Sequence, residues 1–109
     1  MPNYSKNEVV LVRYPFSMLS GEKIRPAVIV NAPHISQDAF LIPLTSRTTS
    51  LLAGEFVLSD WKEAGLHIPT AVKRGIYTVH ESFLLKSVGL LTPADAGQLD
   101  HALRAWLGF

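Results

Sequence analysis

Hydrophobic residues in this chain occur in short runs that are rich in β-branched side chains and are separated by Gly, Pro, Ser and Asn. Such runs predict strands, and several short strands in succession are typical of an all-β sandwich or barrel. The predicted strands cover residues 8–14, 25–30, 39–44, 55–58, 70–73, 76–79 and 87–91. We therefore expect a mainly β fold.

Two of the predicted strands contain proline. Pro26 is the second residue of one strand, and Pro43 lies near the end of the next. Proline has no backbone N–H to donate to a neighbouring strand. Each of the two should therefore mark a strand start, a sheet edge or a bulge.

Residues 59–65 form a short predicted helix. Ser59 is a residue type that caps helix N-termini, and Gly65 is a type that follows helix C-termini. One or two helical turns are expected between them.

The carboxy-terminal residues predict a longer helix. Thr92 is the expected N-cap, Pro93 fits the first helical position, and Asp95 lies near the positive end of the helix dipole. Gly108 should end the helix. Apolar residues at helical spacing form one stripe, which consists of Leu99, Ala102, Leu103, Trp106 and Leu107. We expect this helix to lie across a β-barrel and to carry no catalytic group.

Length and composition favour one domain that covers residues 1–109. Hydrophobic residues make up 48% of the chain and charged residues only 17%, which is more apolar than a monomer of this size needs, so we expect a homodimer. The chain has no cysteine, which excludes disulfides and thiolate metal sites. It has no secretory signal pattern and no run of about 18 apolar residues, so we expect a cytoplasmic protein.

Charge is nearly balanced in total, with a net charge of +1, but it is unevenly placed. Several acidic residues fall in the predicted helices. The basic residues at strand ends or in loops are Lys23, Arg25, Arg47, Lys73 and Arg74. A fold that gathers these loops on one face would have a basic groove suited to nucleic acid, whereas a fold that spreads them would have only solvated surface charge.

The four histidines are the usual candidates for acid and base in metal-free RNA cleavage. No two of them are spaced i, i+4, and the H-E-x-x-H pattern is absent, so we predict no metal site and no cofactor. A single histidine is most often structural or solvent-exposed. His67 and His80 remain secondary candidates because either could lie near the basic loops.

One constellation has chemistry suited to a phosphodiester. An Arg-Pro pair opens one predicted strand with Arg25, and a Pro-Leu-Thr-Ser-Arg segment closes the next with Thr45. Attack of a ribose 2′-OH on its own phosphate builds negative charge on oxygen, and guanidinium donors stabilise that charge. A hydroxyl adds a donor that orients the phosphate. If the two residues lie on neighbouring strands, they can converge on one phosphate.

At these positions the sequence resembles the MazF/PemK family of messenger-RNA interferases, and the resemblance extends over nearly the whole chain. Residues 8–16 read EVVLVRYPF, close to the opening strand of the family. Residues 25–30 read RPAVIV and match its R-P-A element, and residues 42–46 read IPLTS and match its P-(I/L)-T element. Later segments that match are AGL at 64–66, TAVK at 70–73 and VGLL at 88–91. The segment 74–80 departs from the family pattern, a difference that concerns RNA sequence preference more than cleavage.

The resemblance implies a small SH3-like β-barrel with a short helix and a C-terminal helix, which forms a homodimer. It also implies a toxin that cleaves single-stranded RNA at short sequences without metal and leaves a 2′,3′-cyclic phosphate and a 5′-OH. Arg25 would stabilise the phosphate and could donate a proton, and Thr45 would orient the phosphate. The remaining predicted RNA contacts are Tyr14, Phe16, Lys23, Ser46, Arg47, Lys73 and Arg74, with Tyr14 or Phe16 as a base-stacking ring. The expected protein partner is an antitoxin with a disordered acidic tail.

Two other readings stay open. A gyrase poison similar to CcdB shares the fold and uses a carboxy-terminal Trp-Gly-apolar end, for which Trp106 to Phe109 is a candidate. A barrel that has lost catalysis and only binds an antitoxin or RNA is the third. Neither alternative requires Arg25 and Thr45 as a catalytic pair.

Overall fold

A computed structural model describes residues 4–14 and 23–109 of the chain. The elements are β1 (Glu8–Tyr14), β2 (Lys23–Ile29), β3 (Asp38–Thr45), β4 (Phe56–Val57), β5 (Ala71–Val72), β6 (Tyr77–His80), the 3₁₀ helix η1 (Glu81–Phe83), β7 (Leu84–Leu90) and α1 (Pro93–Leu107). The mainly β composition with a C-terminal helix, predicted from the sequence, is therefore confirmed.

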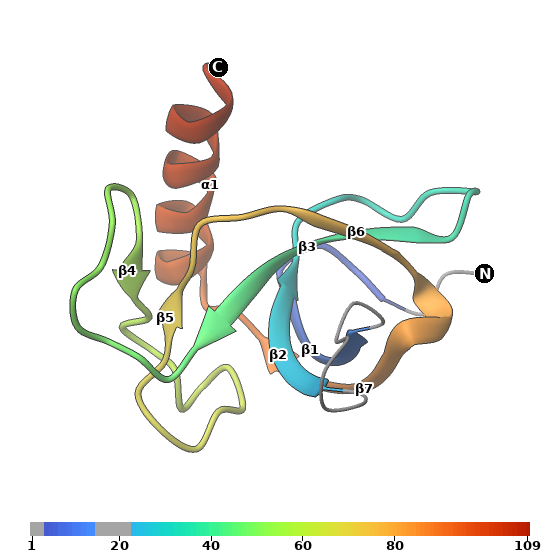
Figure 1. Cartoon of the computed structure of the whole chain (residues 1–109), viewed down its shortest axis with the longest axis horizontal. Helices are drawn as coiled ribbons and strands as arrows, with labels where there is room; N and C mark the ends of the chain where they lie inside the picture. Colours follow the sequence, from blue (N-terminus) through green and yellow to red (C-terminus); the bar gives the residue numbers. More distant parts are fainter. Residues whose placement is uncertain (1–3, 15–22) are drawn as a thin grey trace.

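All seven strands belong to one antiparallel sheet. Its order is β4-β5-β3-β2-β1-β7, and β6 also pairs with β3. Strands β1, β2, β3, β6 and β7 curl around a common interior, with η1 joining β6 to β7 (Figure 1). The sheet is not closed, because no ladder joins β6 to β7 within residues 4–14 and 23–109.

The sheet has a hydrophobic core on each of its faces. The first, here called the helix-side core, lies between the sheet and α1 and includes Val9, Val28, Ile42, Leu44, Phe56, Leu58, Ala64, Val72, Leu91, Leu99 and Ala102. The second, here called the inner core, lies inside the curl and consists of Val10, Val12, Ala27, Ile29, Ala39, Leu41, Val79 and Leu84. Adjacent strand residues alternate between the two cores, as the period of two in a strand requires.

Both prolines lie where a strand loses a partner, as predicted. The β2–β3 ladder covers Ala27 to Ile29, so Pro26 stands where β2 becomes an edge toward β3. Strand β3 pairs with β6 up to Leu41 and with β5 from Leu44 onward. Pro43 falls in the gap between these two partners, where its missing N–H costs no ladder hydrogen bond.

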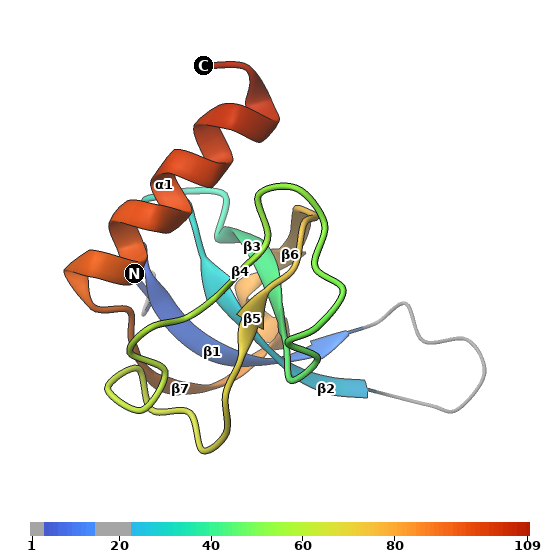
Figure 2. The same cartoon turned by 90° about the vertical axis from the view of Figure 1, so that its left-hand side faces the viewer.

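Helix α1 forms as the sequence predicts. Thr92 caps it by accepting a hydrogen bond from the Asp95 N–H, and Gly108 ends it in the left-handed conformation (φ 81°). Leu99 and Ala102 are buried in the helix-side core, whereas Leu107 is 51% exposed. The far end of α1 projects beyond the sheet in both views (Figures 1 and 2). Within residues 4–14 and 23–109, no helix is long and apolar enough to cross a membrane.

The predicted helix at 59–65 is wrong, because the segment forms consecutive turns instead. The Ala64 N–H bonds the Asp60 carbonyl in a helical pattern, but the next two N–H groups reach carbonyls at other spacings. Gly65 does take the expected positive φ of 89°. So short a segment has little helical stability of its own, and its first N–H groups, those of Ser59 and Asp60, are held by the buried Asp95 carboxylate at 2.9 Å each.

Candidate functional site

The inner core continues, at one end of the curl, into polar residues on the same face. On β2, alternation along the strand places Arg25 on the same face as the buried Ala27 and Ile29. On β3, Thr45 follows the buried Leu41 in the same way. The β2–β3 ladder ends with the pair of Ala27 and Pro43, and Thr45 pairs with Ala71 of β5. Residues two apart on a strand point to the same face, so Arg25 shares the face of Ala27 and Thr45 the face of Pro43. The two side chains therefore lie on the inner face, each two residues beyond the last pair of the ladder.

Lys73 joins this end of the face from β5. Strand β5 pairs Ala71 with Thr45, and the Lys73 N–H donates to the Pro43 carbonyl at 3.0 Å. Lys73 therefore continues the β5 ladder by one residue beside Pro43. Because Val72 is buried in the helix-side core, alternation directs the exposed Lys73 to the opposite face, which is the face of Thr45.

Two tyrosines lie at the same end. The rings of Tyr14, at the end of β1, and Tyr77, at the start of β6, are 6.0 Å apart between centroids at an interplanar angle of 71°. Tyr77 is 43% exposed, and it pairs with Leu41 in the β3–β6 ladder. Sequence reasoning did not select Tyr77. The period of two on β6 could have found it, because Val79 of the inner core places Tyr77 on the inner face.

The electrostatics link these tyrosines to Arg25. Burial raises the pKa of the Tyr14 hydroxyl, the neighbouring Tyr77 raises it further, and the charge of Arg25 opposes the rise. The hydroxyl oxygen is buried and accepts or donates no hydrogen bond within the described residues. Tyr14 therefore lies neutral and largely covered beneath the site, close enough to Arg25 to interact with its charge.

Local hydrogen bonds hold the two predicted catalytic residues. The Thr45 Oγ1 accepts the N–H of Arg47 at 3.1 Å, which fixes the hydroxyl rotamer and leaves its own proton able to donate outward. The Arg25 Nη1 donates to the carbonyl of Ile24 at 3.3 Å, and the residue is exposed. The guanidinium keeps its other donors for a ligand.

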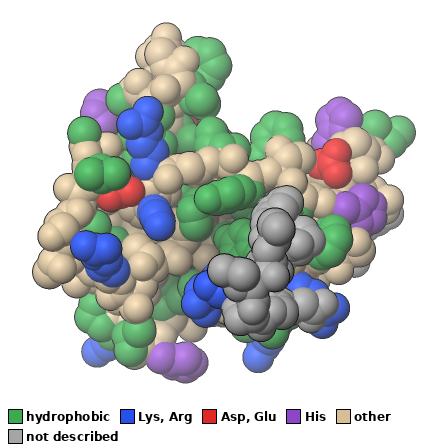
Figure 3. Space-filling view, in the orientation of Figure 1, with side chains coloured by type: hydrophobic (Ala, Val, Ile, Leu, Met, Phe, Trp, Pro, Cys, Tyr) green, Lys and Arg blue, Asp and Glu red, His purple; other side chains and the backbone are tan. Residues whose placement is uncertain are grey.

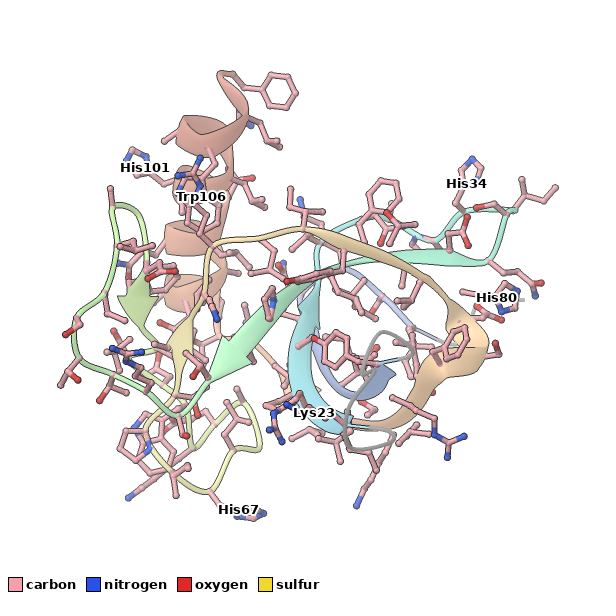
Figure 4. The ribbon with its side chains drawn as sticks, viewed as in Figure 1. Lys23, His34, His67, His80, His101 and Trp106 are labelled. Atoms are coloured by element: carbon pink, nitrogen blue, oxygen red, sulfur yellow. The ribbon has the colours of Figure 1, made fainter. Side chains whose placement is uncertain are left out.

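The other predicted contact residues surround this end unequally. Ser46 and Arg47 are exposed directly after β3, and Lys23 is exposed at the start of β2 (Figure 4). Lys and Arg side chains lie on both sides of a band of hydrophobic side chains on this face of the molecule (Figure 3). Phe16 lies outside the described residues.

The backbone N–H of Arg74 is bound by the side chain of an acidic residue. The Glu55 carboxylate accepts the N–H of Arg74 at 2.8 Å and that of Leu52 at 2.7 Å. These two hydrogen bonds, first that of Arg74, lower the pKa of Glu55, and the charges of Lys73 and Arg74 lower it further. Glu55 thereby fixes the 52–55 turn to the strand end that carries the two basic residues.

The histidines lie apart from one another and from this cluster (Figure 4). His80 pairs with Asp38, at the opposite end of β3 from Thr45, which is about 23 Å away along the eight-residue strand. Its Nδ1 accepts the Ser82 N–H at 3.1 Å and caps η1. His67 is exposed in the bend after the 59–65 turns. His80 is therefore too far from Thr45 for acid–base work at that end of the face.

Trp106 has a structural role in the fold. Its Nε1 donates to the carbonyl of Ala53 at 3.2 Å, and its ring packs against the helix-side core. Gly54 lies so close that an added Cβ would be 2.4 Å from that nitrogen. Phe109, by contrast, is 86% exposed. In the part of the chain that the structure describes, no three His, Asp or Glu side chains are grouped as metal ligands.

Solved structures similar to this chain are toxins and their complexes. An endoribonuclease in complex with its cognate antitoxin, from a mycobacterial species, has a TM-score of 0.76 at 20% identity, with 97% of this chain and 96% of the other covered. The Mycobacterium tuberculosis toxin MazF-mt6 has a TM-score of 0.72 at 20% identity, with coverage of 94% and 97%. MazF from Deinococcus radiodurans has a TM-score of 0.76 at 15% identity, with coverage of 97% for both. These likenesses show the fold.

Sequence comparison identifies the family. A search of curated proteins found no significant match. A family model described as the PemK-like, MazF-like toxin of type II toxin–antitoxin systems matches residues 5–107. Because that match covers nearly the whole chain, the protein belongs to the PemK-like, MazF-like family of toxins of type II toxin–antitoxin systems.

Proposed function

We propose that this protein is a sequence-specific, metal-independent endoribonuclease, a cytoplasmic toxin whose single domain cleaves single-stranded messenger RNA. The observation that supports the proposal is that Arg25 and Thr45 lie on neighbouring strands and on the same face, each two residues beyond the last pair of the β2–β3 ladder. Family membership supports the same activity, since MazF-like toxins are generally endoribonucleases.

The reaction is an internal transesterification. The ribose 2′ oxygen attacks the adjacent phosphorus, the bond from phosphorus to the 5′ oxygen breaks, and the 2′ proton ends on the departing 5′ oxygen. The products are a 2′,3′-cyclic phosphate and a 5′-OH, and no water or cofactor is consumed. Arg25 stabilises the negative charge that builds on the non-bridging oxygens and is the candidate proton donor. Thr45 donates its hydroxyl proton to the same phosphate and orients it.

The remaining basic residues bind the flanking backbone. Lys73 faces the same end as Thr45, and Arg47, Ser46 and Lys23 are exposed around it. A run of cations along one groove binds single-stranded RNA without sequence preference and is weakened by salt.

The test is cleavage of a long single-stranded RNA in excess EDTA by wild type, Arg25→Ala, Thr45→Ala and the control Arg104→Ala. Arg104 is exposed on α1, where it pairs with Asp100 at 2.9 Å. Loss of one charge-stabilising donor costs about 10²- to 10³-fold in rate. We expect wild type and the control to cut at a few defined sites and both site variants to be silent but folded. RNA left intact by wild type would overturn the proposal. If wild type still arrested growth, the gyrase-poison function would replace it.

We further propose a homodimer that an antitoxin neutralises by laying a disordered acidic tail along the basic groove. Large apolar side chains exposed at the end of α1, Leu107 and Phe109, support a second subunit. Sedimentation equilibrium at micromolar concentration should give twice the mass of one chain, and the mass of one chain would refute the dimer. Titration with the antitoxin should abolish cleavage, and full cleavage at saturation would refute neutralisation.

A further inference from the structure

Tyr77 presents an aromatic ring at the polar end of the inner face. The ring is 43% exposed, although Val79, the next residue on the same face, is 4% exposed in the inner core. Its edge-to-face contact with Tyr14 holds it in place, because aromatic pairs at this separation and angle attract each other. Tyr14 in turn is half-buried, with its hydroxyl oxygen fully covered. The pair therefore consists of a supporting ring and a presented ring.

Gly75 keeps the surface beside that ring open. Its φ of 147° lies in the region that side chains rarely adopt. A Cβ at this position would be 3.6 Å from Tyr77 Cε2 and 4.0 Å from Pro43 Cδ. Any longer side chain would therefore extend over the ring or the proline. The position that a side chain of residue 75 would occupy, beside Tyr77 and Pro43, is here called the slot, and Pro43 is two residues along β3 from Thr45.

The slot adjoins the phosphate site through two links. Arg25 acts electrostatically on Tyr14, which contacts Tyr77. Lys73 bonds the backbone of Pro43, the other wall of the slot. A flat group held between Tyr77 and Pro43 would thus have cationic and hydroxyl donors next to it, which is the arrangement of a base and its own backbone phosphate.

We propose that Tyr77 is the stacking surface for one unpaired nucleobase beside the phosphate held by Arg25 and Thr45, and that it helps determine which RNA sequence is cut. This inference rests on the proposed ribonuclease function. Every base has a π face, so stacking supplies affinity, and differences in stacking strength between bases supply a modest sequence preference. Tyr77 belongs to the segment 74–80, in which the sequence departs from the family pattern.

The experiment uses an RNA oligonucleotide that spans a mapped cleavage site, together with a series in which each flanking nucleotide in turn is made abasic. The variants are Tyr77→Ala, Tyr77→Phe and Tyr77→Leu. Leucine fills space without a flat π surface, which separates stacking from packing. The control is Phe40→Ala, because Phe40 is 45% exposed and pairs with Thr78, which places it on the opposite face of the same sheet region. Melting temperature and mass are measured for every variant.

We expect Tyr77→Ala and Tyr77→Leu to lose roughly 5- to 150-fold in cleavage efficiency, the worth of one stacked base, while Tyr77→Phe stays near wild type. In wild type, one abasic position should cause a similar loss. In Tyr77→Ala that same abasic position should cause no further loss, whereas the penalties at other positions should be unchanged. The Phe40→Ala control should retain the wild-type efficiency and the wild-type abasic profile.

Full efficiency in Tyr77→Leu, or an unchanged abasic profile in folded Tyr77→Ala, would overturn the inference while leaving the ribonuclease function intact. Binding of the same oligonucleotides is followed by fluorescence anisotropy in parallel. If wild type bound without cutting and the abasic penalty still depended on Tyr77, the stacking surface would stand and the enzymatic proposal would fall. If wild type neither bound nor cut the RNA, both would fall.

Discussion

The buried carboxylate of Asp95 should control the stability of the whole chain. It is fully buried and accepts two backbone N–H bonds of 2.9 Å, from Ser59 and Asp60. Asp95→Asn keeps the shape but leaves one oxygen acceptor and sets an NH₂ group against the second N–H. Loss of a hydrogen bond to a charged group costs about 1.5–3 kcal/mol of stability. The buried N–H that is left without an acceptor adds part of its desolvation penalty to that loss. We expect a total of about 3 kcal/mol.

That loss corresponds to a fall in melting temperature of about 13 °C for a chain of this length, from an unfolding entropy of roughly 2.1 cal/mol/K per residue. Circular dichroism during heating measures it. The matched control is Asp100→Asn, on the exposed side of the same helix, where the pair with Arg104 is solvated and the midpoint should stay within about 2 °C. A shift no larger than that for Asp95→Asn would refute the structural role assigned to the carboxylate. Because the 59–65 turns lie on the helix-side core, RNA cleavage well below the melting temperature should be unaffected.

Three further outcomes follow. Gly54→Ala should lower the free energy of unfolding by about 1–3 kcal/mol, because the φ of Gly54 is 85° and the new Cβ would meet Trp106. Gly97→Ala, inside α1 with open space around it, should raise the free energy of unfolding by about 0.5–1 kcal/mol. Denaturant titrations that ranked the two variants in the opposite order would contradict both. Backbone hydrogen bonds hold the pKa of Glu55 below its ordinary 4.5, so the contribution of Glu55 to the free energy of unfolding is complete above pH 4.5 and is lost as the pH falls through the lowered pKa. Glu55→Gln should therefore reduce the fall in stability at acid pH. An unchanged dependence of stability on pH would exclude the contribution. Lys73→Ala should weaken RNA binding uniformly across sequences and reduce the salt slope by about 0.7, and a sequence-dependent loss would contradict a pure phosphate contact.

The strands and the C-terminal helix were predictable because local pattern and tertiary packing agree there. Thr92 and Gly108 are residue types that favour helix ends in any sequence, and they cap α1 in the fold. The turns at 59–65 were not predictable, because a segment of one or two turns is marginal as a helix and the N–H groups at its start bond a carboxylate 35 residues or more away in the sequence. The residues next to Ser59 in the sequence do not indicate that Asp95 will be its partner.

The candidate site divides in the same way. Arg25 and Thr45 were selected by their chemistry and by resemblance, and the β2–β3 pairing shows that their strands are neighbours. Tyr77 needed the β3–β6 ladder, since only pairing with Leu41 shows which face it presents. The capping contact of His80 was likewise invisible until the 3₁₀ helix was seen.

The alternation of side chains between the two faces of each strand limits how the sequence of this protein can change. The inner core and the polar end of its face occupy alternate positions of the same strands, so a one-residue slip in the pairing register of β2 or β3 would turn Arg25 or Thr45 outward together with the buried residues. Loss of the site by slippage would therefore coincide with loss of the fold. Gly75, which precedes β6, is free of that constraint. Its φ of 147° disfavours any side chain, so a substitution there would strain the backbone locally, beside Tyr77, without changing the strand alternation that fixes the core.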